Sequence, residues 1–125
     1  MINRILADKI IALKQKFPVI TLTGPRQSGK TTLLKSIFPE MPYVNLEDVD
    51  VRSFAINDPR GFLSNFPEGA IFDEVQRTPD LFSYIQGLVD SGNRSYILSG
   101  SQNYLLMDRI TQSLAGRAAI LKLLP

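Results

Sequence analysis

Residues 19–32 of this 125-residue chain read VITLTGPRQSGKTT, and the fold class can be predicted from this segment. Its first five residues are β-branched or apolar and lie between Pro18 and Gly24, which predicts a strand buried on both faces. A helical pattern then runs from Lys30 to about Phe38, so a glycine-containing turn separates the strand from a helix. Strand, turn and helix in this order predict an α/β domain built on a parallel sheet.

The turn has the Walker A spacing, in which four residues separate Gly24 from a Gly-Lys-Thr run. Gly24 turns the chain, Gly29 lets backbone N–H groups approach phosphates, and the start of the helix offers its positive dipole end. Lys30 can bridge the terminal phosphates, the Thr31 hydroxyl can replace one water on Mg²⁺, and Thr32 can extend the contacts toward the α-phosphate. The motif leaves the residue types at 26 and 27 free. The predicted phosphate-binding residues are Gly24, Pro25, Arg26, Gln27, Ser28, Gly29, Lys30, Thr31 and Thr32.

A second motif, Ala70-Ile71-Phe72-Asp73-Glu74, has the form of Walker B, an apolar strand that ends in acidic residues. We expect Asp73 to hold Mg²⁺ through water, because this ion keeps several of its waters. The adjacent Glu74 can orient and activate the attacking water. The two carboxylates therefore predict a metal ligand and a general base.

Three further residues are candidates for supporting roles in catalysis. Ser101 or Gln102, after the predicted strand 96–98, can hydrogen-bond the γ-phosphate or the attacking water, or can cap the next helix. Arg117 precedes the last predicted strand, and its forked, permanently charged guanidinium suits charge stabilisation in phosphoryl transfer. The alternative for Arg117 is an ordinary surface arginine.

The rest of the chain repeats the alternation of helix and strand. Apolar residues recur every three or four positions over residues 2–17, which predicts an amphipathic helix. Further strands are expected at 43–46, 70–72, 96–98 and 118–124, and further helices at 48–57, 58–66, 80–89 and 103–115. The pattern predicts one α/β domain with a parallel sheet and helices on both faces.

The amino-acid composition limits the class of protein and the side chains that are available for catalysis. Hydrophobic residues make up 44% of the chain and charged residues 21%, as in soluble globular domains. The sequence has no cysteine and no histidine, so catalysis must use carboxylates, lysine, arginine or hydroxyls. No apolar run approaches the roughly 18 residues of a membrane span, so we expect a cytoplasmic protein without a membrane partner. The basic residues of the first third alternate with apolar ones, which indicates a solvated helix face and leaves nucleic-acid binding open.

These motifs together resemble the AAA+ superfamily of P-loop ATPases. More closely, they are similar to a family of bacterial and archaeal ATP-binding proteins in which an AAA+ core precedes a C-terminal domain of uncertain function. The segments that carry the resemblance are residues 24–32, 45–48, 72–76, 99–102 and 114–117. The resemblance implies a three-layer P-loop NTPase fold with strand order 5-1-4-3-2 and Mg-ATP as ligand. It also implies a sensor role for Ser101 and an arginine-finger role for Arg117.

The leading interpretation is an ATPase that converts ATP binding and hydrolysis into a conformational signal for an effector domain. Since the last predicted strand reaches Pro125, we expect residues 1–125 to be the AAA+ core of a longer chain, without the lid and the C-terminal domain and with impaired turnover alone. We place Arg117 at the interface of a homo-oligomer. The alternatives are a nucleotide-switched scaffold without turnover and a small-molecule kinase that uses Asp48 and Asp50. A GTPase is less favoured, because no Asn-Lys-x-Asp motif occurs.

Overall fold

Five parallel strands form a single sheet in this computed structural model, which describes residues 4–25, 29–92, 94–101, 108–110, 112 and 114–122. The spatial order of the strands is β2-β3-β4-β1-β5, and every neighbouring pair is parallel. Their bounds are β1 (Val19–Thr23), β2 (Tyr43–Asn45), β3 (Gly69–Asp73), β4 (Ser95–Gly100) and β5 (Ala118–Lys122). Both the predicted parallel sheet and its predicted order are confirmed.

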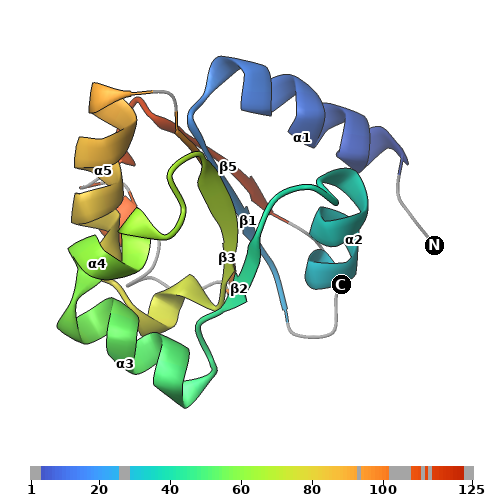
Figure 1. Cartoon of the computed structure of the whole chain (residues 1–125). Helices are drawn as coiled ribbons and strands as arrows, with labels where there is room; N and C mark the ends of the chain where they lie inside the picture. Colours follow the sequence, from blue (N-terminus) through green and yellow to red (C-terminus); the bar gives the residue numbers. More distant parts are fainter. Residues whose placement is uncertain are drawn as a thin grey trace.

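Helices cover both faces of this sheet and make three layers (Figure 1). The helices are α1 (Arg4–Lys16), α2 (Lys30–Ile37), α3 (Val49–Asn57), α4 (Pro59–Ser64) and α5 (Leu81–Ser91), with a short 3₁₀ helix η1 (Val75–Arg77). In Figure 1, α1 and α2 lie on one side of the strands, and α3, α4 and α5 lie on the other. Among the described residues, no helix combines the length and the apolar character that crossing a bilayer requires.

Two aspartates fix where helices begin on the second of these faces. Asp48 precedes α3, and its Oδ1 accepts hydrogen bonds from the backbone N–H groups of Asp50 at 3.0 Å and Val51 at 3.4 Å. Asp58 precedes α4, and its Oδ1 accepts from Gly61 N at 3.0 Å. Such N-caps satisfy donors that the first helical turn leaves unpaired. The helices predicted to start near 48 and 58 therefore start there.

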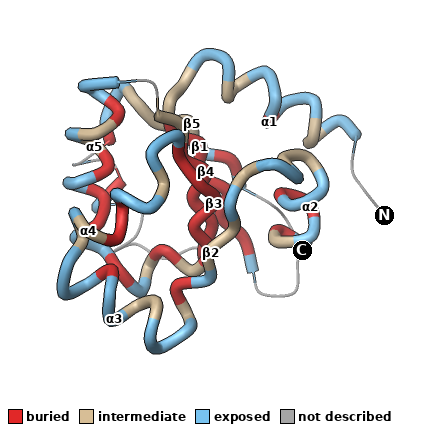
Figure 2. Tube along the Cα trace, in the orientation of Figure 1, coloured by how far each residue is buried: buried red, intermediate tan, exposed pale blue. Residues whose placement is uncertain are grey.

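The core has two halves because alternate strand residues point to opposite faces of the sheet. Ile20 and Ile71 belong to the apolar cluster beneath α1 and α2, whereas Phe72 and Tyr96 belong to the cluster beneath α3, α4 and α5. β1 and β3 are buried along their length and β4 from Tyr96 to Gly100, as Figure 2 shows in red. Burial on both faces leaves the strand ends as the places where polar side chains can meet a ligand.

Three details differ from the sequence-based expectations or lie beyond them. β3 begins at Gly69, where φ is +118° and an added Cβ would overlap the backbone oxygen of Ser95. η1 follows β3 and was not predicted. The helix expected over 103–115 falls largely outside the described residues, although 108–110 are helical and Ile110 is buried.

Candidate functional site

The candidate site is formed where β1, β3 and β4 end. The backbone N–H of Gly24, directly after β1, donates to the carbonyl of Gly100 at the end of β4, with N and O 3.3 Å apart. This bond places the start of the glycine-rich loop (residues 24–31) beside half-buried Ser101. Open parallel sheets bind ligands outside the carboxyl ends of their strands. The structure therefore brings Ser101 to the same edge as the predicted phosphate-binding residues.

The lysine of the glycine-rich loop is folded against the beginning of that loop. Gly29 adopts the left-handed conformation, with φ 85° and ψ 11°, and α2 starts at the next residue. Lys30 is only 8% exposed, and its Nζ donates to the carbonyl oxygens of Gly24 at 2.7 Å and Pro25 at 3.0 Å. Thr32 is exposed on the first turn of α2. The predicted contacts of residues 26–28 lie outside the described residues.

The two predicted metal ligands contact each other directly. The hydroxyl of Thr31, on α2, donates to Asp73 Oδ2, at the end of β3, across 2.6 Å. The other carboxylate oxygen of Asp73 accepts from the backbone N–H of Glu74 at 2.9 Å, and Asp73 is only 7% exposed. A carboxylate and a hydroxyl are the hard oxygen donors that Mg²⁺ prefers. The donor set therefore fits this ion.

Tyr43 is a member of the site that the sequence-based reasoning missed. Its hydroxyl donates to the same Asp73 Oδ2 at 2.7 Å, and Lys35 Nζ lies 4.1 Å from the centre of its ring. Burial and the hydrogen bond to Asp73 raise the pKa of Tyr43 to about 12. In the sheet Tyr43 pairs with Ile71, which is two residues before Asp73 and so on the same face. Only the strand register reveals this contact.

Glu74 adopts a strained backbone conformation beside Asp73. Its φ of 58° and ψ of 42° are left-handed, and among the described residues it alone has a positive φ without being glycine. Such a conformation costs of order 1–3 kcal/mol and clusters at functional sites. Gln76, on η1, donates its Nε2 to Glu74 Oε1 at 2.9 Å, a contact that was not predicted. Glu74 thus has its own partner, separate from those of Asp73.

Arg117 lies at the opposite end of the sheet from the glycine-rich loop. Its carbonyl accepts from Val19 N at the start of β1, five residues and roughly 16 Å of strand from Gly24. Its Nε donates to Asp90 Oδ1 on α5 at 2.6 Å, and its Nη1 donates to Ala115 O at 3.0 Å. The hydrogen bond from Arg117 lowers the pKa of Asp90. The structure does not bring Arg117 together with the phosphate-binding residues of its own chain.

A buried strand that leads through a glycine-rich loop into a helix, on a sheet of this order, defines the class of P-loop NTPase folds. The model of an AAA domain family matches residues 16–125 of this chain. The chain belongs to this family of AAA domains.

The chain is also similar to two curated proteins and to solved structures. Two mycobacterial proteins, the uncharacterized proteins Mb2031c of Mycobacterium bovis and Rv2008c of Mycobacterium tuberculosis, are each 38% identical over 126 residues. The match covers 97% of this chain, which spans 28% of the length of these curated relatives. The Walker-type ATPase PABY2304 of Pyrococcus abyssi has a TM-score of 0.67 at 20% identity, over 100% of this chain and 54% of that one. The DnaC helicase loader has a TM-score of 0.59 at 16% identity, over 92% and 86%. Both solved structures share the fold of this chain.

Proposed function

We propose that this domain binds Mg-ATP at the glycine-rich loop and hydrolyses it to ADP and phosphate. The observation that carries the proposal is the 2.6 Å hydrogen bond between Thr31 and Asp73. These residues are 42 positions apart, and the contact joins α2, the helix that follows the glycine-rich loop, to the carboxyl end of β3. Two oxygen donors of this kind, beside a loop whose spacing suits phosphates, support a nucleotide and magnesium site.

Binding rests on cationic and dipolar groups of this chain. The backbone N–H groups of the loop and the start of α2 attract the phosphates. Lys30 Nζ, which now donates to two loop carbonyls, exchanges these neutral acceptors for charged phosphate oxygens. Thr31 and Asp73 would hold Mg²⁺, which when bound neutralises charge on the β- and γ-phosphates.

Hydrolysis rests on Glu74. Its carboxylate accepts a proton from the water whose oxygen bonds to the γ-phosphorus, while the bond from that phosphorus to the β–γ bridging oxygen breaks. Gln76 positions Glu74 by donating to Oε1, which leaves Oε2 to accept the proton. Ser101, at the same edge of the sheet, hydrogen-bonds the γ-phosphate or the attacking water.

The remaining roles belong to assembly and signalling. Since Arg117 lies at the far end of the strands, we place its guanidinium at the ATP of a neighbouring copy in a homo-oligomer. The conformational change that depends on the bound nucleotide is transmitted to an effector domain of a longer chain in the cytoplasm. These roles rest on the family resemblance and on the position of Arg117.

Specific contacts bear on the alternatives. A small-molecule kinase would use Asp48 and Asp50 to hold the hydroxyl that accepts the phosphoryl group, but Asp48 Oδ1 is already engaged as the N-cap of α3. A scaffold that only binds nucleotide would have no use for Glu74 held in a strained conformation. Both observations favour hydrolysis.

Calorimetric titration with Mg-ATP tests the binding step. Lys30→Ala should weaken binding roughly tenfold to a hundredfold, because charge-assisted hydrogen bonds to phosphate are lost. Lys9→Ala, which removes an exposed lysine of α1, is the matched control and should bind as the wild type does. A thermal melt confirms that the variants are folded. Equal affinity of Lys30→Ala and the wild type would refute the assignment of the loop.

A further inference from the structure

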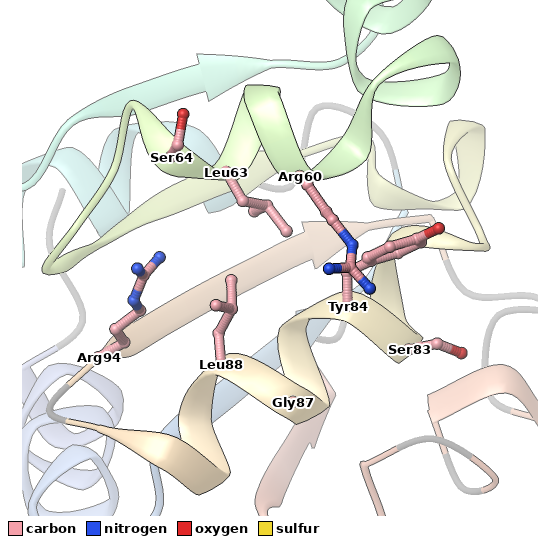
Figure 3. Close-up of a pocket in the computed structure, with 8 residues that line it drawn as sticks. All are labelled: Arg60, Leu63, Ser64, Ser83, Tyr84, Gly87, Leu88 and Arg94. Atoms are coloured by element: carbon pink, nitrogen blue, oxygen red, sulfur yellow. The ribbon is translucent and has the colours of Figure 1, made fainter.

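A pocket of about 710 Å³ lies between α4 and α5, and none of its lining residues belongs to the proposed nucleotide site. Its walls come from these two helices and from Arg94, which directly precedes β4 (Figure 3). Sites for small molecules usually enclose roughly 300–1,000 Å³, with mostly apolar walls and a few placed polar groups. The size and the lining of this pocket fit that description.

The charged groups of the pocket are two arginines, Arg60 and Arg94, and no acidic residue lines it. The Arg60 guanidinium lies 5.8 Å from the centre of the Tyr84 ring, and Arg94 Nη1 donates to the hydroxyl of buried Tyr96 at 3.3 Å. Within the described part of the chain, neither arginine has a carboxylate partner. Two cations without counter-ions give the pocket a preference for anions.

The acidic residues at the two ends of α5 are engaged elsewhere. Asp80, which precedes this helix, pairs with Arg109 at 3.1 Å, and Asp90, near its end, pairs with Arg117 at 2.6 Å. Both carboxylates therefore already have arginine partners, and those partners are not Arg60 or Arg94. The two pocket arginines keep their remaining N–H donors for a ligand.

Apolar groups occupy the space between the two charges. Figure 3 shows Arg60 and Arg94 at opposite ends of the pocket, with the side chains of Leu63 and Leu88 directed toward each other between them. The guanidinium fork of arginine suits a planar carboxylate, and leucine side chains suit an apolar body. The shape of the complementary ligand is an apolar body with an acidic group at each end.

Gly87 shapes one wall of the pocket. It lies inside α5 and lines the pocket, and a Cβ added there would meet no atom within 4 Å. Packing thus does not require glycine at this position. Alanine would fit there and would also stabilise the helix. The missing side chain leaves one wall of the pocket open to close approach.

We infer that the pocket between α4 and α5 is a binding site for a small organic dianion with an aromatic or other apolar body. Arg60 and Arg94 bind one acidic group each, and Leu63, Leu88 and the open surface at Gly87 accept the body between them. This site does not depend on the proposed nucleotide site, so either can fail without the other.

The test uses naphthalene dicarboxylate as the probe and its neutral diamide as a control matched in shape. Binding is followed from the amide resonances of the isotope-labelled protein, with and without Mg-ATP. We expect the dicarboxylate to shift resonances of α4 and α5 in both conditions and the diamide to bind at least tenfold more weakly.

Substitutions inside and outside the pocket test where the probe binds. Arg60→Ala and Arg94→Ala should each weaken dicarboxylate binding roughly tenfold. Arg4→Ala, which removes an exposed arginine of α1, should have no effect. Gly87→Ala should raise the melting temperature yet weaken binding, a combination that general destabilisation cannot produce.

Three results would overturn the inference. The first is the absence of dicarboxylate binding, or binding equal to that of the diamide. The second is displacement of the probe by Mg-ATP, which would place it at the nucleotide site. The third is tighter binding of a capped Asp-Phe-Leu-Asp peptide, which would replace the small molecule with an acidic protein segment as the occupant.

Discussion

The carboxylate of Asp73 is the point at which three parts of the chain meet. Thr31 on α2, Tyr43 on β2 and the backbone of Glu74 all donate hydrogen bonds to it. A buried carboxylate needs such partners, because desolvation of an unpaired charge is costly. The same bonds fix the position of the Asp73 carboxylate oxygens, which we propose as metal ligands, and so reduce the ordering cost of binding.

The raised pKa of Tyr43 gives a pH-dependent prediction for the metal-free protein. The phenol ionises near 10 when unfolded and at about 12 when folded, so its contribution to stability is complete below roughly pH 10 and is lost as pH rises through 12. Urea unfolding at about pH 8 and pH 11 should therefore show a smaller loss of stability in Tyr43→Phe than in the wild type. Equal losses in both proteins would contradict the raised pKa.

At the level of the elements, two glycines should respond to alanine in opposite directions. Gly69 begins β3 with φ +118°, and a Cβ there would overlap the carbonyl oxygen of Ser95. Gly69→Ala should therefore cost more than about 2 kcal/mol of stability. Gly87→Ala, inside α5 with open space around it, should gain roughly 0.5–1 kcal/mol. Denaturant unfolding measures the stability of both variants. Destabilisation of similar size in the two would contradict the close backbone contact at Gly69 and the open space at Gly87.

The elements also show what the sequence could and could not reveal. β1 was predictable residue for residue, because Pro18 and Gly24 bound a β-branched run that both faces of the sheet bury. The helix starts were predictable from Asp48 and Asp58, whose carboxylates bond to nearby N–H groups. Features of this kind depend on a few consecutive residues.

Contacts between distant segments were not predictable in the same way. Tyr43 reaches Asp73 because β2 and β3 pair in one register, and no local pattern near Tyr43 encodes that register. The contact of Gln76 with Glu74 depends on η1 and on a left-handed residue, which sequence patterns do not specify. The ion pair of Arg117 with Asp90 depends likewise on how α5 packs on the sheet.

At the scale of the whole molecule, the position of Arg117 predicts that hydrolysis depends on assembly. An arginine supplied by a neighbouring copy can raise the hydrolysis rate about a thousandfold or more. Arg117→Ala should therefore lower the rate sharply. Mixing Arg117→Ala with Lys30→Ala protein should restore part of the activity, since one copy supplies the arginine and the other the nucleotide site.

Asp90→Ala is the matched control for that experiment. It breaks the same 2.6 Å ion pair but leaves the guanidinium in place, so it should keep the wild-type rate. Absence of rescue in the mixture, together with a protein that stays monomeric in Mg-ATP, would return Arg117 to a purely structural role.

We propose that this AAA domain hydrolyses the ATP it binds and that Glu74 activates the attacking water. The most direct test measures Mg-ATP affinity and single-turnover phosphate release on the same samples of wild type, Glu74→Gln and Glu68→Gln. Glu68 is an exposed carboxylate in the turn before β3, which makes it a matched control. We predict that Glu74→Gln binds Mg-ATP as the wild type does but releases phosphate at least a hundredfold more slowly, because the amide cannot accept the proton. Phosphate release by Glu74→Gln at the wild-type rate would exclude Glu74 as the general base.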